Sequence, residues 1–93
     1  MLSGCEKDSY YGEATLHFHG FNDEMSIYIY PIELWDSYIL SGYPLKKLTL
    51  DKEGDVKITK LLPGNYFWWD TGSTKGVFQI IEDEKLSFHY YNW

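Results

Sequence analysis

The chain of 93 residues contains no arginine, a single cysteine and no long apolar run. One cysteine excludes a disulfide within the chain, so the fold has to hold without a covalent crosslink. No apolar run approaches the roughly 20 residues that a membrane-spanning helix needs. Lysine carries all the positive charge in a chain of net charge −6, which argues against nucleic acid as a partner. Phosphate recognition favours the arginine side chain, and an acidic body is repelled by phosphate.

Motifs that carry catalysis are also missing. The sequence has no G-x-S-x-G motif and no glycine loop that could hold a phosphate. Residues 51–55 and 82–84 are acidic, and their composition is typical of solvated turns. The first of them lacks the distant glutamate that completes a calcium-binding loop. We therefore expect a protein without enzymatic activity, without a cofactor and without a calcium site.

Aromatic residues are abundant, with nine tyrosines, five phenylalanines and four tryptophans, which lets a small domain bury a large area per residue. Beyond residue 12, short segments alternate apolar and polar side chains, and turn residues separate them about every 8–12 positions. This pattern predicts an all-β fold, a seven-stranded antiparallel β-sandwich. The expected core consists of the inward positions of the strands: Leu16, Phe18, Ile27, Ile29, Leu48, Leu50, Val56, Ile58, Tyr66, Trp68, Phe78, Ile80, Leu86 and Phe88.

Two segments depart from the strand pattern. Near residues 33–43 we expect a short helix or an irregular loop, because four apolar residues fall on one helical stripe: Leu34, Trp35, Tyr38 and Ile39. Residues 1–12 are expected to form a flexible tether, because most of them are polar and glycine interrupts them. The sandwich domain then occupies residues 13–93.

Residues 2–5 are Leu-Ser-Gly-Cys, which resembles the lipobox of bacterial lipoproteins. In that family the cysteine receives a diacylglyceryl thioether and becomes the N-terminus, so the resemblance implies lipidation of Cys5. A lipoprotein precursor also carries a charged and an apolar segment upstream, and only Met1 precedes the motif here. Two interpretations stay open: a lipoprotein whose leader was trimmed, or a chance match in a cytosolic protein with one free cysteine.

A second resemblance covers residues 51–66. The segments D-K-E-G-D-V-K-I (51–58) and L-L-P-G-N-Y (61–66) are similar to motifs of carboxypeptidase-regulatory-like and Cna-B-type domains. The resemblance implies the prealbumin, or transthyretin-like, β-sandwich. Some Cna-B domains form a Lys–Asn isopeptide bond, for which Asp70 and Asn92 would be suitably placed. The first predicted strand, 13–19, contains no lysine, so we expect no such crosslink.

Three histidines raise the question of a metal site. His17 and His19 share one face of the first predicted strand, and their spacing suits two metal ligands. His89 could join them if the first and last strands pair. Because no carboxylate is evidently placed to complete the set, the sequence favours three solvent-facing imidazoles, and we expect no metal site.

Aromatic residues on the outward positions form the candidate binding face. Alternation sends Tyr66 and Trp68 inward and leaves five rings outside the predicted core: Trp69, Phe67, Tyr28, Tyr30 and Trp35. Such rings can stack on sugars or anchor a protein interface. Alternatively, they pack beneath the segment at residues 33–43 and form covered surface.

Together these patterns predict a non-enzymatic interaction or structural module of a diderm bacterium. It would be lipid-anchored to the outer membrane through Cys5, facing the periplasm or the cell surface. Its expected partner is another extracytoplasmic protein or a glycan, and not a nucleic acid. The main alternative is a carbohydrate-binding module that uses the outward aromatic residues. A metal-binding or catalytic protein is the third class.

Overall fold

A computed structural model describes residues 11–22, 24–36 and 44–92. The predicted tether with Cys5, apart from its last residues, and most of the predicted helix or loop lie outside these ranges. The helical turn that is described is too short to span a bilayer. In chain order the elements are β1 (Gly12–His19), β2 (Ser26–Pro31), the 3₁₀ helix η2 (Ile32–Leu34), β3 (Lys46–Thr49), β4 (Asp55–Leu61), β5 (Gly64–Trp69), β6 (Lys75–Ile80) and β7 (Lys85–Tyr91).

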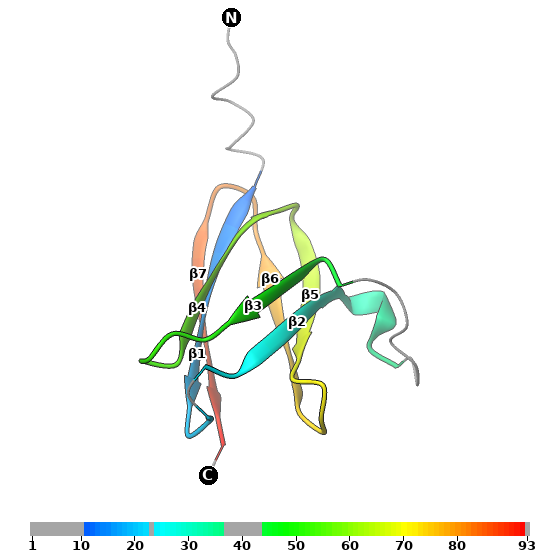
Figure 1. Cartoon of the computed structure of the whole chain (residues 1–93). Coiled ribbons are helices and arrows are strands. Elements are labelled where there is room, and N and C mark those ends of the chain that lie inside the picture. Colours follow the sequence, from blue (N-terminus) through cyan, green and yellow to red (C-terminus); the bar gives the residue numbers. More distant parts are fainter. Residues whose placement is uncertain (1–10, 23, 37–43, 93) are drawn as a thin grey trace, which may run out of the picture.

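The strands form two sheets that face each other, as Figure 1 shows. Sheet A has the order β4-β1-β7, and sheet B has the order β3-β2-β5-β6. The all-β sandwich predicted from the sequence is therefore confirmed. One pair departs from the antiparallel expectation, because β1 and β7 run parallel. The whole domain separates these two strands in sequence, so no hairpin imposes antiparallel pairing on them.

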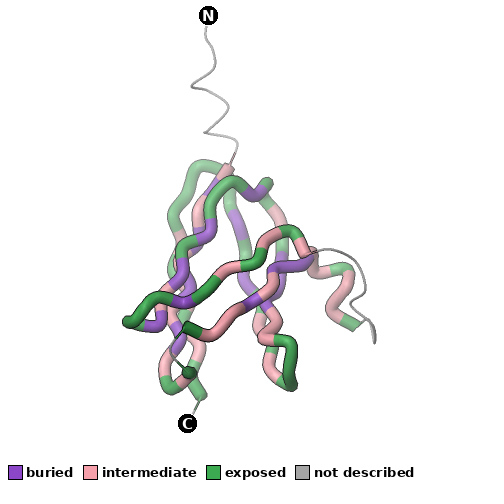
Figure 2. The backbone as a smooth tube through the Cα atoms, in the orientation of Figure 1, coloured by how far each residue is buried: buried purple, intermediate pink, exposed green. Residues whose placement is uncertain are grey.

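The core lies between the sheets, and buried positions alternate along the strands (Figure 2). Most of the predicted inward residues are buried. Leu48 and Phe88 pack against the core while partly exposed, and Leu86 is half-buried. Two close contacts depend on glycine. A Cβ on Gly76 would lie 2.7 Å from Nε1 of Trp68, and one on Gly54 would lie 2.5 Å from the carbonyl oxygen of Phe18.

The motif at residues 51–66 forms the turns that its residues predict. Asp51 Oδ1 accepts hydrogen bonds from the backbone N–H groups of Glu53 and Asp55, both at 2.9 Å. Gly54 has a φ of 85°, a conformation that costs other residues energy. In the turn before β5, the carbonyl oxygen of Leu62 accepts a hydrogen bond from the hydroxyl of Tyr66, whose ring is buried. Both turns thus direct the strands that follow them into the core.

Candidate functional site

The outer face of sheet B carries the aromatic residues that the sequence singled out. Tyr28 on β2 lies opposite Trp69 on β5. Lys47 of β3 continues this row on one side and Lys75 of β6 on the other. Tyr28, Trp69, Lys47 and Lys75, together with Trp35, are called the aromatic face below.

Two of the predicted face residues are not exposed. Phe67 is 0% exposed and Tyr30 is 3% exposed. The Phe67 ring stacks on Tyr30 with centroids 5.6 Å apart and meets Trp35 edge-on at 5.3 Å. Of the two alternatives left open by the sequence, Phe67 and Tyr30 follow the second: they are covered surface and not part of an exposed binding face. They form a small apolar layer outside the sheet, and burial raises the pKa of the Tyr30 hydroxyl.

The remaining three rings, those of Tyr28, Trp35 and Trp69, are half-buried. The Trp69 indole is fixed because its Nε1 donates to the carbonyl oxygen of Gly72 at 2.9 Å. Lys75 Nζ lies 4.4 Å from the Trp35 ring centroid and donates to the Trp35 carbonyl oxygen. Such cation–π contacts hold the ammonium group over the ring. The aromatic face therefore presents apolar surface with positive charge, on a protein whose overall charge is negative.

Asp70, considered for crosslinking in the sequence, instead closes the turn after Trp69. Its Oδ1 accepts hydrogen bonds from the backbone N–H groups of Gly72 at 2.8 Å and Thr74 at 3.3 Å. Asn92 Nδ2 lies 3.5 Å from the carbonyl oxygen of Gly20, to which it donates. Both side chains therefore form hydrogen bonds with backbone groups: Asp70 within its own turn, and Asn92 with the residue that follows β1.

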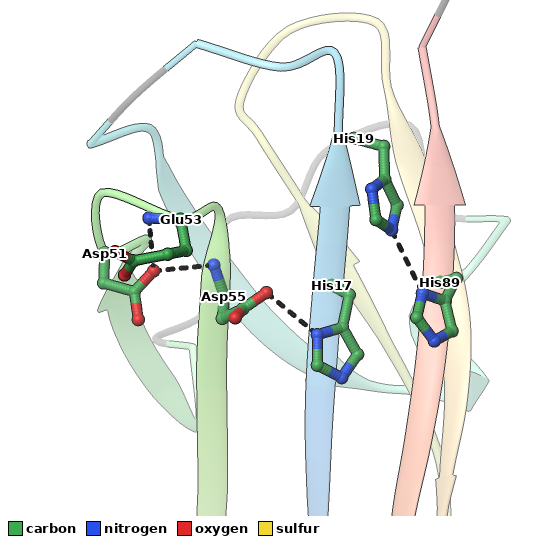
Figure 3. Close-up of polar contacts among 6 residues, drawn as sticks. All are labelled: His17, His19, Asp51, Glu53, Asp55 and His89. Atoms are coloured by element: carbon green, nitrogen blue, oxygen red, sulfur yellow. Dashed lines mark hydrogen bonds and ion pairs between the residues drawn. The ribbon is translucent and has the colours of Figure 1, made fainter.

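The outer face of sheet A brings all three histidines together (Figure 3). His17 lies opposite His89 in the parallel pair, and their rings stack with centroids 4.5 Å apart. His19 Nε2 lies 3.0 Å from His89 Nδ1. On the other side, His17 Nδ1 lies 2.8 Å from Asp55 Oδ1. These four side chains are called the histidine row: Asp55, His17, His89 and His19.

Asp55 is the residue of this row that the sequence analysis missed. The sequence placed it in an acidic turn. It is also the first residue of β4, the strand that contains the second half of the segment at residues 51–58. Antiparallel pairing of β4 with β1 places Asp55 opposite His17. Nevertheless, within the part of the chain that the structure describes, no three His, Cys, Asp or Glu side chains already form a complete metal-binding set.

A hollow of about 280 Å³ lies elsewhere, near the start of β1. Its lining includes Tyr11, Lys60 and Glu84, and no residue of the aromatic face or the histidine row. Neither candidate surface is therefore part of that hollow. Because the aromatic face and the histidine row lie outside a hollow, they suit a macromolecular partner or an ion better than an enclosed small molecule.

No protein-family model matches the chain, and no curated protein sequence matches it. Among solved structures, its fold is similar to that of a minor pilin from the Gram-positive pathogen Streptococcus agalactiae. The TM-score is 0.63 at 16% sequence identity, over 89% of this chain and 44% of the pilin chain. The chain thus spans less than half the length of that pilin. At this identity the likeness establishes the β-sandwich fold alone.

Proposed function

We propose that the chain is a non-enzymatic interaction module that works outside the cytoplasm of a diderm bacterium, attached to the outer membrane by lipid on Cys5. The aromatic face is the observation that carries the interaction role, and the lipobox-like residues 2–5 are the basis for the anchor. Tyrosine and tryptophan side chains are enriched among the residues that anchor protein interfaces. The fold, which is similar to that of a minor pilin, agrees with such a role.

A protein partner suits the aromatic face better than a glycan does. Lys75 already lies over the ring of Trp35, so part of the surface on which a sugar would stack is covered. Val77, which lies opposite Phe67, is 52% exposed and extends the apolar surface. A partner with apolar side chains and carboxylates would match both the rings and the lysines.

Carbohydrate binding remains the second candidate, because Tyr28 and Trp69 are cross-strand neighbours whose rings are part-exposed. Two adjacent rings on a sheet can stack on successive sugar units. A glycan array therefore separates the two candidates. Binding that Trp69→Ala abolishes would favour the glycan, whereas no binding would favour the protein partner.

Site-specific photo-crosslinking in intact cells tests the interaction directly. A photoreactive amino acid replaces Tyr28 on the aromatic face or, as the matched control, Thr15 on the outer face of sheet A. We expect a discrete crosslinked species from position 28 that the Trp69→Ala change removes, and none from position 15. Equal crosslinking from both positions would contradict the assignment of the binding surface.

The anchor has a separate test. Expressed with a complete leader, the protein should partition into membranes and gain the mass of the acyl chains, and Cys5→Ser should release it. Two or three acyl chains hold a small domain durably, whereas one chain binds only marginally. A wild-type protein that stays in the soluble fraction with an unmodified cysteine would refute lipid attachment.

A further inference from the structure

We propose that the histidine row binds a divalent transition-metal ion, with Cu²⁺ as the best match, through His19 Nε2 and His89 Nδ1. This inference is independent of the proposed function, because it concerns the opposite face of the sandwich. It also departs from the expectation drawn from the sequence. The sequence could not show that β1 and β7 are neighbours, and their pairing is what brings these two rings together.

The separation of the two nitrogens is the first argument. They lie 3.0 Å apart and share a hydrogen bond. Two metal–nitrogen bonds of about 2.0–2.1 Å span about 2.9 Å when they meet at a right angle and about 3.3 Å at the tetrahedral angle. The observed separation falls between these values, close to the right angle. The ion would lie off the line that joins the two nitrogens, so each ring has to turn until its lone pair points at the ion, while the nitrogens themselves keep nearly their present separation.

The proton is accounted for by a change of tautomer. In a neutral pair, one of the two facing nitrogens carries the hydrogen that the other accepts. When both nitrogens become ligands, that hydrogen moves to the other nitrogen of the same ring. Each imidazole stays neutral, and each presents a lone pair to the ion. Water completes the coordination, so the site needs no third protein ligand.

His17 and Asp55 act as positioning residues. The His17 ring stacks on His89 at 4.5 Å with an angle of 16° between the planes, which restrains the ligand ring. His17 is itself held by its 2.8 Å contact with Asp55. Asp55 thus acts on the proposed site indirectly, since it holds His17, whose ring stacks on the ligand His89. Asp51 and Glu53 lie on the Asp55 side of His17, away from the ligand pair (Figure 3), and add negative charge to this face of the protein.

The nitrogen donors favour Cu²⁺ over the other candidates. Imidazole suits Cu²⁺, Ni²⁺ and Zn²⁺, and affinity for divalent ions reaches its maximum at Cu²⁺. Bonds near a right angle belong to the tetragonal coordination that Cu²⁺ adopts. Mg²⁺ and Ca²⁺ require oxygen ligands and should not bind at this pair.

Calorimetric titration with Cu²⁺ tests the proposal, using the full chain with Cys5→Ser to remove the thiol as a competing ligand. We expect one ion per chain, with electron paramagnetic resonance showing coordinated nitrogen. His19→Ala and His89→Ala should each weaken binding by about 100-fold or more, since each removes one of two ligands. Asp55→Asn should weaken binding by less than either histidine change, because Asp55 acts on the ligands only through His17.

Ser87→Ala is the matched control, because Ser87 lies on the same face of β7, two residues before His89, and is exposed. It should bind Cu²⁺ as the parent does. Bound metal should also raise the melting temperature of the parent and of Ser87→Ala, but not of His89→Ala. Affinities for the two histidine variants within twofold of the parent, with circular dichroism confirming that they fold, would overturn the proposal.

Discussion

The two sheets bury their inner faces in the same way, but their outer faces differ. On sheet B, Phe67 and Tyr30 are buried beneath neighbouring side chains, so this sheet has apolar packing on both sides. The outer face of sheet A carries polar side chains instead, among them the stacked rings of His17 and His89. A small domain has limited core area, and aromatic layers outside a sheet add to it. The outer face of sheet A is then free to carry polar side chains such as the three histidines.

The largest expected effect comes from truncating the covered layer. Phe67→Ala should lower the free energy of unfolding by about 3–5 kcal/mol, because it leaves a cavity under Trp35 and Tyr30. His89→Ala, on the exposed face of sheet A, should cost about 1 kcal/mol or less. Denaturant unfolding of both variants measures the difference. Similar losses for the two would mean that the outer faces contribute equally to stability.

The turn between the sheets should show an intermediate effect. Asp51→Ala removes the acceptor for two backbone N–H groups, those of Glu53 and Asp55, and should cost about 1–2 kcal/mol. Glu53→Ala, a neighbouring change in the same exposed turn, should stay within about 0.5 kcal/mol. Equal melting temperatures for the two variants would show that the side chain of Asp51 does not hold this turn.

The last expected effect appears only in alkaline solution, at Tyr90 on β7. Burial raises the pKa of the Tyr90 hydroxyl to about 12, and this hydroxyl donates to the carbonyl oxygen of Val77. In the unfolded chain tyrosine ionises near pH 10, so the unfolded state loses its proton first. The resulting stability is complete below about pH 10 and falls as the pH rises towards 12.

Urea unfolding at several pH values between 10 and 12 measures this loss. The decline should be less steep in Tyr90→Phe, which has no hydroxyl to ionise. Tyr91→Phe, a change at the exposed neighbouring residue, should keep the decline of the wild type. The other tyrosines are present in both variants, so they do not affect the comparison. Parallel curves for all three proteins would contradict the assignment to Tyr90.

Alternation along the sequence was sufficient to predict which residues face the core. Leu16 and Phe18, for example, are buried as their strand pattern requires. The same pattern placed Phe67 and Tyr30 on the outward side correctly, but it left open whether they are exposed or covered, and the structure shows them covered. Period-two alternation assigns a side chain to a face of a sheet but does not show what covers that face. The cover over Phe67 comes from Trp35, which belongs to the segment at residues 33–43 that the sequence offered as a cover, and from Lys75 on the neighbouring strand.

The histidine row shows the same limit for the candidate sites. The spacing of His17 and His19 placed them on one face, as the sequence alone could establish. Whether His89 joins them depends on which strands pair and in which direction. The parallel pairing of the first and last strands decides this, and it brings in Asp55 through β4 on the other side of β1. Such long-range pairing leaves no local mark in the sequence.

The parallel pairing of β1 with β7 also determines how the domain bears tension. The strands lie side by side, and the start of β1 and the end of β7 point to opposite ends of the molecule (Figure 1). A force that pulls the chain ends apart therefore slides one strand along the other. The evenly spaced hydrogen bonds of a parallel pair then share the load, whereas strands that are peeled apart from one end lose their hydrogen bonds one after another. Under such a force the β1–β7 pair would resist extension until its hydrogen bonds break together.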